Sequence, residues 1–171
     1  MVDANLTVYE REPMKTARFM APLALIRDRF IMVLGGLISR NSPTKVCECY
    51  DTMTNHWFNT AALPSMSTNC TAVVMNERWI YMMPGSNKDA QAGNSLYINL
   101  LDTGSSSAFG DDRSSKDYGS VIARQKWSQL EVTNSEFVRA QPVAGIQYSN
   151  MEMLIFGGDS TKTFQFDTRE V

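Results

Sequence analysis

One segment type occurs three times along this chain, and the repetition restricts the fold more than any other feature. In each copy an apolar strand runs into a glycine turn, and after a variable gap a second apolar strand ends in Asp. Internal repeats are typical of folds that pack similar units side by side. The glycine strands are Phe30–Gly36, Trp79–Gly85 and Met153–Gly158, and the strands that end in Asp are Cys49–Asp51, Leu96–Asp102 and Phe164–Asp167.

The spacing of the copies indicates one insertion. Gly36 and Gly85 are 49 residues apart, whereas 73 residues separate Gly85 from Gly158. The segment 102–125 accounts for the excess, because it is rich in Gly, Ser and Asp and contains few apolar residues. This composition predicts a long exposed loop.

The units have the pattern of antiparallel sheets, with four strands in each of the first two. A further apolar stretch precedes each glycine strand, and a short polar turn joins the two, which is typical of a β-hairpin. These first strands are nearly all apolar, which predicts burial on both faces. In the first two units a Trp after the Asp indicates a fourth strand, and helical periodicity is absent, so the units have the pattern of propeller blades. The polar turns are Arg27–Arg29, Asn76–Arg78 and Ser149–Asn150.

These residues resemble the kelch-repeat family, whose pattern is a hydrophobic run into Gly-Gly, a Tyr that closes the third strand and a Trp in the fourth. The resemblance covers nearly all of the chain. It implies an all-β fold, namely a kelch-type β-propeller segment of about three four-stranded antiparallel blades that is incomplete as a closed ring. The matching positions are Gly35, Gly36, Tyr50 and Trp57 in the first unit, Gly85 and Trp127 in the second, and Gly157 and Gly158 in the third.

The strand count predicts three blades at about residues 14–64, 65–132 and 140–171. Residues 1–13 are expected to hold a stray outer strand at Leu6–Glu10, because it precedes Pro13 much as the Trp57 strand precedes Pro64. The third blade lacks the corresponding strand. Exposed blade faces favour association. We therefore expect either a segment of a longer propeller or a chain that pairs with another copy or with another protein in a large complex.

Composition limits the partners. The net charge of −2 gives no general attraction to nucleic acid or to anionic lipid. No apolar run is long enough to span a bilayer and no signal peptide is recognisable, so we expect no membrane insertion and a cytoplasmic location, with cytoskeletal association as one form of it. Three cysteines do not suit a disulfide framework. The sequons at Asn5 and Asn69 point the other way, towards secretion.

We expect no catalytic residues, no cofactor and no metal site. The single His56 has no second histidine beside it to complete a metal or copper site, and Cys47 and Cys49 suit packing better than catalysis. In a four-stranded blade, the loops between the second and third strands share one rim with the interblade linkers. The resemblance implies partner-binding loops there and in the insertion, and ordinary solvated loops are the alternative. The residues concerned are Arg40, Asn41, Asn87, Lys88, Asp111, Asp112 and Arg113.

The sequence as a whole favours a non-catalytic protein–protein interaction or structural scaffold module within a larger intracellular assembly. Two alternatives stay open. One is a sugar-active or glycan-binding propeller, which the residue inventory disfavours. The other is the substrate-recognition subunit of a ubiquitin ligase, a role that in this family usually comes with an adaptor domain.

Overall fold

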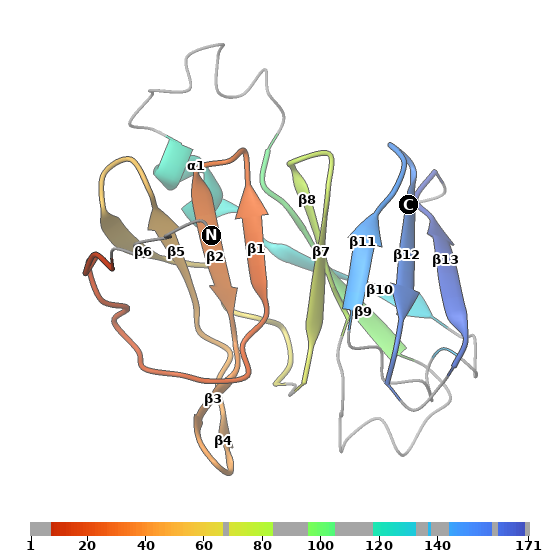
Figure 1. Ribbon diagram of the computed structural model, residues 1–171, viewed down its shortest axis with the longest axis horizontal. Coiled ribbons are helices and arrows are strands. Elements are labelled where there is room, and N and C mark those ends of the chain that lie inside the picture. The colour runs from red at the N-terminus through yellow and green to blue at the C-terminus, as the bar shows by residue number, and fades with distance from the viewer. Residues whose placement is uncertain are drawn as a thin grey trace, which may run out of the picture.

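The computed structural model describes residues 8–66, 69–83, 96–104, 118–132, 137, 144–158 and 161–169. In these residues three antiparallel sheets of three or four strands stand side by side (Figure 1), and β3 (Leu37–Ser39) and β4 (Ser42–Pro43) form a separate two-stranded sheet. Sheet 1 has the order β1 (Leu23–Ile26), β2 (Phe30–Leu34), β5 (Cys47–Asp51) and β6 (His56–Thr60). Sheet 2 consists of β7 (Thr71–Met75), β8 (Trp79–Met83), β9 (Leu96–Asp102) and β10 (Trp127–Val132), and sheet 3 of β11 (Ala144–Gln147), β12 (Glu152–Phe156) and β13 (Thr163–Asp167).

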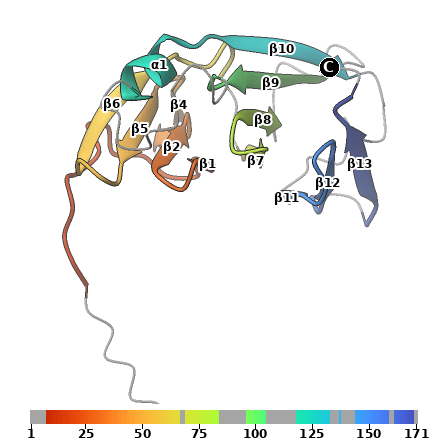
Figure 2. The ribbon, with the colours of Figure 1, turned by 90° about the horizontal axis from the view of Figure 1, so that it is seen from above.

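The three sheets follow an open arc. Their first strands β1, β7 and β11 contact one another in that order, and the view from above shows sheets 1 and 3 at the two ends of the arc (Figure 2). The fold is therefore mostly β, built from small antiparallel sheets of about four strands that do not close into a ring among the described residues. This confirms the fold class predicted from the sequence.

The hairpin turns form where the polar residues predicted them. Arg27 and Asp28 both have positive φ, as have Asn76 and Glu77. The Arg29 amide donates to Ile26 and the Arg78 amide to Met75, each at 3.1 Å. Two central residues with positive φ define a type I′ turn, whose twist matches that of the flanking strands. Sheets 1 and 2 therefore begin with the same turn.

Two hydrophobic cores fill the spaces between the sheets. The first lies between sheets 1 and 2 and includes Phe30, Met32 and Met82. The second lies between sheets 2 and 3 and includes Met83 and Met153. Alternate side chains of each middle strand point to opposite faces, so sheet 2 contributes to both cores. Methionines therefore fill part of both cores.

Three expectations need correction. The insertion 102–125 was expected to be a loop without helix, but Tyr118–Arg124 form the helix α1, because Tyr118 and Ile122 lie one turn apart and are both buried against sheet 1. The first strand was expected to be buried on both faces, but Leu23 and Leu25 of β1 are half exposed or more. Residues 8–10 of the expected outer strand Leu6–Glu10 lie in no strand, and its first two residues lie outside the described part.

Candidate protein-interaction surface

The loop that was expected to bind a partner is an ordered hairpin. Leu37–Ser39 (β3) pairs with Ser42–Pro43 (β4), and the Ser39 and Ser42 hydroxyls lie 2.9 Å apart. The backbone of Leu37 also exchanges two hydrogen bonds with Phe19, at 2.9 and 3.0 Å. The linker before sheet 1 and the loop between its second and third strands therefore share one rim, as predicted.

Gly36 makes this contact between linker and hairpin achievable. Its φ is +91°, a conformation that side chains disfavour. A Cβ on Gly36 would lie 2.7 Å from the Ala21 Cβ and 2.9 Å from the Phe19 carbonyl oxygen. The glycine turn thus has two functions, since it ends the strand and it admits the linker.

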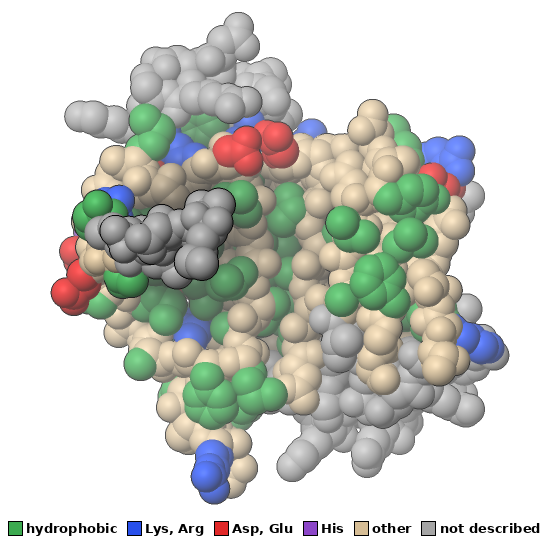
Figure 3. Space-filling view, viewed as in Figure 1, with side chains coloured by type: hydrophobic (Ala, Val, Ile, Leu, Met, Phe, Trp, Pro, Cys, Tyr) green, Lys and Arg blue, Asp and Glu red, His purple; other side chains and the backbone are tan. Residues whose placement is uncertain are grey.

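Large apolar side chains are exposed beside this hairpin. Phe19, Met20 and Ile38 are 45, 54 and 51% exposed, and Arg40 and Asn41 follow at the exposed tip. Figure 3 shows hydrophobic side chains gathered next to the basic tip of the hairpin. We call the set Phe19, Met20, Ile38, Arg40 and Asn41 the rim surface. An exposed apolar group on an ordered support is typical of interaction sites.

A buried ion pair fixes the linker that carries Phe19. The Arg18 guanidinium lies 3.3 Å from a carboxylate oxygen of Glu48, and both side chains are almost fully buried. Arg18 also donates to the carbonyl oxygens of Thr16 and Gly35, at 3.2 and 3.0 Å. Because a buried charge needs a partner, Glu48 on β5 holds the linker against the back of sheet 1.

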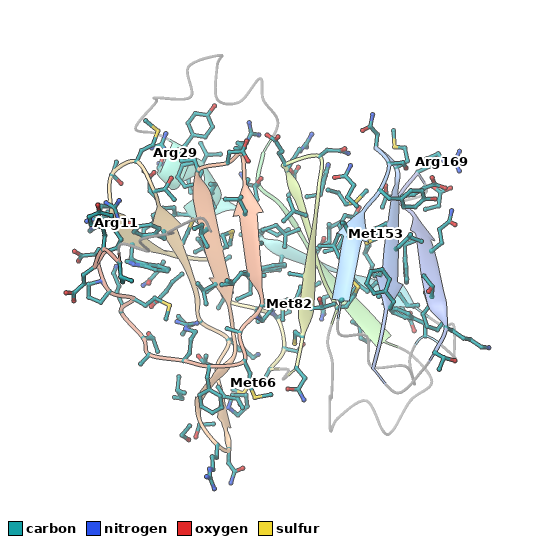
Figure 4. All side chains as sticks on the ribbon, viewed as in Figure 1. Arg11, Arg29, Met66, Met82, Met153 and Arg169 are labelled. Carbon is teal, nitrogen blue, oxygen red and sulfur yellow. The ribbon has the colours of Figure 1, made fainter. Side chains whose placement is uncertain are left out.

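The opposite rim carries a structural clamp that occurs twice. Arg29 donates two hydrogen bonds of 2.7 Å to the two carboxylate oxygens of Asp51. Arg78 donates two of 2.6 Å to Asp102 in the same manner. Bidentate pairs of this kind are strong and directional. Each clamp joins the first turn of its sheet to the end of the third strand. Figure 4 shows Arg29 at one end of sheet 1 and Met66, in the linker that follows the sheet, at the opposite end.

The clamps shift the pKa values of their members. The hydrogen bonds from Arg29 lower the pKa of Asp51 to about 2, and the Met53 amide and the Thr54 hydroxyl add to this effect. The bonds from Arg78 likewise lower the pKa of Asp102. Both carboxylates are therefore ionised and fully engaged near neutral pH, which makes them structural rather than acid–base groups.

Sheet 3 has the same backbone hydrogen bond as sheets 1 and 2 at this position, but its side chains differ. The amides of Thr52, Thr103 and Thr168 donate to the carbonyls of Arg29, Arg78 and Met151, respectively, so Met151 occupies the arginine position. Asp167 pairs instead with Arg169, two residues further along the chain. The described residues of the third unit thus show no clamp between the turn and the third strand.

The predicted motif residues are partly brought together. The rings of Tyr50 and Trp57 lie 5.1 Å apart, and the Trp57 indole donates to the Glu12 carbonyl oxygen at 2.7 Å. The Trp127 indole donates to Ala61 at 3.0 Å. Gly35, Gly157 and Gly158 have positive φ like Gly36. Gly85, Asn87, Lys88, Asp111, Asp112 and Arg113 lie outside the described residues.

The side chains considered for catalysis or metal binding are Cys47, Cys49 and His56. Cys47 and Cys49 are free and buried, and burial raises the pKa of the Cys47 thiol to about 11. His56 is exposed at the start of β6. Within the described part of the chain, no group of three His, Cys, Asp or Glu side chains could hold a metal ion. The described helix is too short to cross a membrane.

The sequence comparison identifies a kelch motif in this chain, matched at residues 31–64. This range begins in β2, includes the β3–β4 hairpin and extends past β6 to the linker. The resemblance drawn from Gly35, Gly36, Tyr50 and Trp57 is thereby confirmed for the first unit. No curated protein matches the chain.

Proposed function

We propose that this chain is a non-catalytic protein-interaction module that acts as a structural scaffold in a larger intracellular assembly. The rim surface is the observation that carries the proposal. Kelch repeats commonly mediate protein binding, and here the matched motif contains Ile38, Arg40 and Asn41. Apolar anchors with an arginine beside them suit a protein partner, because interfaces are enriched in such residues.

The rigidity of the support favours this use of the rim. The hairpin is fixed by backbone bonds to Phe19, and the linker is fixed by Arg18 and Glu48. A side chain on a rigid support loses little conformational entropy on binding. We place the assembly in the cytoplasm, with a cytoskeletal structure as one setting, since the free thiols Cys47 and Cys49 suit a reducing compartment.

The test compares two exposed apolar residues on opposite rims. Ile38→Asp puts a charge on the rim surface, and Met53→Asp makes the same type of change in the turn after β5, where Met53 is 63% exposed. Proteins retained by the immobilised chain and by each variant are quantified by mass spectrometry. We expect Ile38→Asp to reduce a stoichiometric partner by at least about tenfold, and Met53→Asp to leave it unchanged. Equal retention by all three proteins would contradict the proposal.

A further inference from the structure

The outer edge of sheet 3 is free among the described residues. Sheets 1 and 2 each carry a fourth strand at this edge, β6 beside β5 and β10 beside β9, whereas within the described part of the chain β13 pairs with β12 alone. The Thr168 amide donates to the Met151 carbonyl at 2.7 Å. Backbone groups alternate in direction along an antiparallel strand, so the amides of Phe164 and Phe166 face β12. Those of Thr163, Gln165 and Asp167 then face the free edge.

The other end of the arc presents a segment of the right type. Residues 8–12, here called the arm, belong to no strand, and Val8 and Tyr9 are largely exposed. β-branched and aromatic residues of this type favour strands. The arm leaves sheet 1 at the end of the arc away from β13 (Figure 2). Its last residue is fixed, since the Glu12 amide donates to the Asn55 side chain at 3.1 Å and the Glu12 carbonyl accepts the Trp57 indole.

Two tryptophan contacts align the arm with β6. Trp57 donates to Glu12 just as Trp127 donates to Ala61, so Glu12 is the counterpart of Ala61. Counting back from these positions aligns Val8 with Trp57 and Tyr9 with Phe58. In sheet 1, Phe58 pairs with Cys49. Asp51 and Asp167 are equivalent, so the counterpart of Cys49 on β13 is Gln165. The arm in this register would therefore place Tyr9 opposite Gln165.

We propose that a second copy of this chain supplies its arm as the fourth strand at the free edge of β13. The connectivity of the described chain supports this. The outer strand β6 completes sheet 1, and the chain then continues into sheet 2, which packs on sheet 1. In the same way, β10 completes sheet 2, and the chain continues into sheet 3, which packs on sheet 2. The outer strand of one sheet is thus followed in the chain by the sheet that packs beside it. By the same rule, an arm bound to β13 places its own sheet 1 against sheet 3 of the other copy.

The two faces that this arrangement brings together are apolar and exposed. Leu23 and Leu25 of β1 are half exposed or more. Their counterparts in β7, Ala72 and Val74, pack against the first core. Ile146 of β11 is 57% exposed, whereas its counterpart in β7, Val73, is buried. Burial of this apolar surface stabilises the pair of copies in addition to the strand pairing.

The test uses the full chain in sedimentation velocity over a wide range of concentration. Gln165→Pro removes an edge amide without removing one that faces β12, and Tyr9→Pro removes the amide that would meet it. Each variant should weaken self-association by at least about tenfold, the equivalent of one or two hydrogen bonds. The controls Gln165→Ala and Tyr9→Val keep both amides and should associate nearly as the parent chain does.

Mixing the two proline variants gives a sharper result. The Gln165→Pro chain keeps its arm and the Tyr9→Pro chain keeps its edge, so an equimolar mixture can form one intact junction and should associate more tightly than either variant alone. A parent chain that stays monomeric at every concentration overturns the proposal, as does a mixture that behaves like its components. Hydrogen exchange avoids folding defects, because it uses the chain without substitutions. The amides of Thr163, Gln165 and Asp167 should become protected as the protein concentration rises. Protection that is absent, or that is already complete at high dilution, would contradict pairing between copies.

Discussion

Replacing Arg29 with Met tests the clamp of sheet 1 with a side chain that this fold already uses. Met151 occupies the equivalent position in sheet 3. In sheet 1 the change removes two hydrogen bonds of 2.7 Å and leaves Asp51 in a site where the two side chains are only 8 and 9% exposed. Breaking a buried ion pair costs about 3–5 kcal/mol. Asp51 keeps its bonds from Met53 and Thr54, so we expect the lower end, about 3 kcal/mol.

Arg78→Met is the matched control. The clamp between Arg78 and Asp102 has the same bidentate geometry, but its side chains are 32 and 34% exposed. Water solvates the remaining carboxylate there and screens the original attraction, so the expected loss is about 1 kcal/mol. The difference between the two variants therefore measures the effect of burial on one and the same interaction.

Urea denaturation followed by tryptophan fluorescence measures both losses, and circular dichroism checks that the two probes give the same transition. Restoring neutrality with Asp51→Asn in the Arg29→Met background should recover part of the loss, because the uncompensated charge is then removed. Equal destabilisation by Arg29→Met and Arg78→Met would refute the reasoning, since geometry alone would then determine the contribution of the clamp.

Three further results are expected. First, because the folded-state pKa of Asp51 is about 2 and its ordinary value is 3.8, its contribution of about 2 kcal/mol is fully present above pH 4 and is lost as the pH falls towards 2; acid titration of the unfolding free energy should show this loss, and Arg29→Met should reduce it. Second, Gly145→Ala should destabilise the folded protein by about 2 kcal/mol, because the new Cβ would lie 2.4 Å from Val73 Cγ2. Denaturation of the double variant with Val73→Ala should show favourable coupling between the two changes, and strict additivity would argue against this contact. Third, a bulky thiol reagent should modify Cys70 in the folded protein and should reach the buried Cys47 and Cys49 only after denaturation; rapid reaction of all three thiols would contradict the packing.

Local patterns predicted the sheets well because they depend on neighbouring residues. Asn76 and Glu77 favour a tight turn, and the apolar residues on both sides favour strands, so the hairpin was recognisable. The helix α1 was missed because Tyr118 and Ile122 supply few apolar contacts of their own and become buried only against Phe30 and its neighbours. A segment of this kind is stabilised by tertiary packing rather than by its own periodicity.

The rim surface was predicted in part. Arg40 and Asn41 were identified as candidates for partner contact, whereas Phe19 and Met20 were not. Their exposure depends on the pairing of Phe19 with Leu37, which are far apart in sequence. The clamps left a usable signal, since an arginine precedes an aromatic residue at Arg29 and at Arg78, and Asp is followed by Thr in all three units.

The sequence alone determined that this protein consists of three similar β units, because glycine turns, alternating apolar strands and polar hairpins act over a few residues. The tertiary structure decided which surfaces those units leave open. Whether Leu23 is buried like its counterpart Ala72, or whether the edge of β13 is paired, depends on which sheet lies beside it. Burial is a property of neighbours brought together by folding, and no local pattern contains that information.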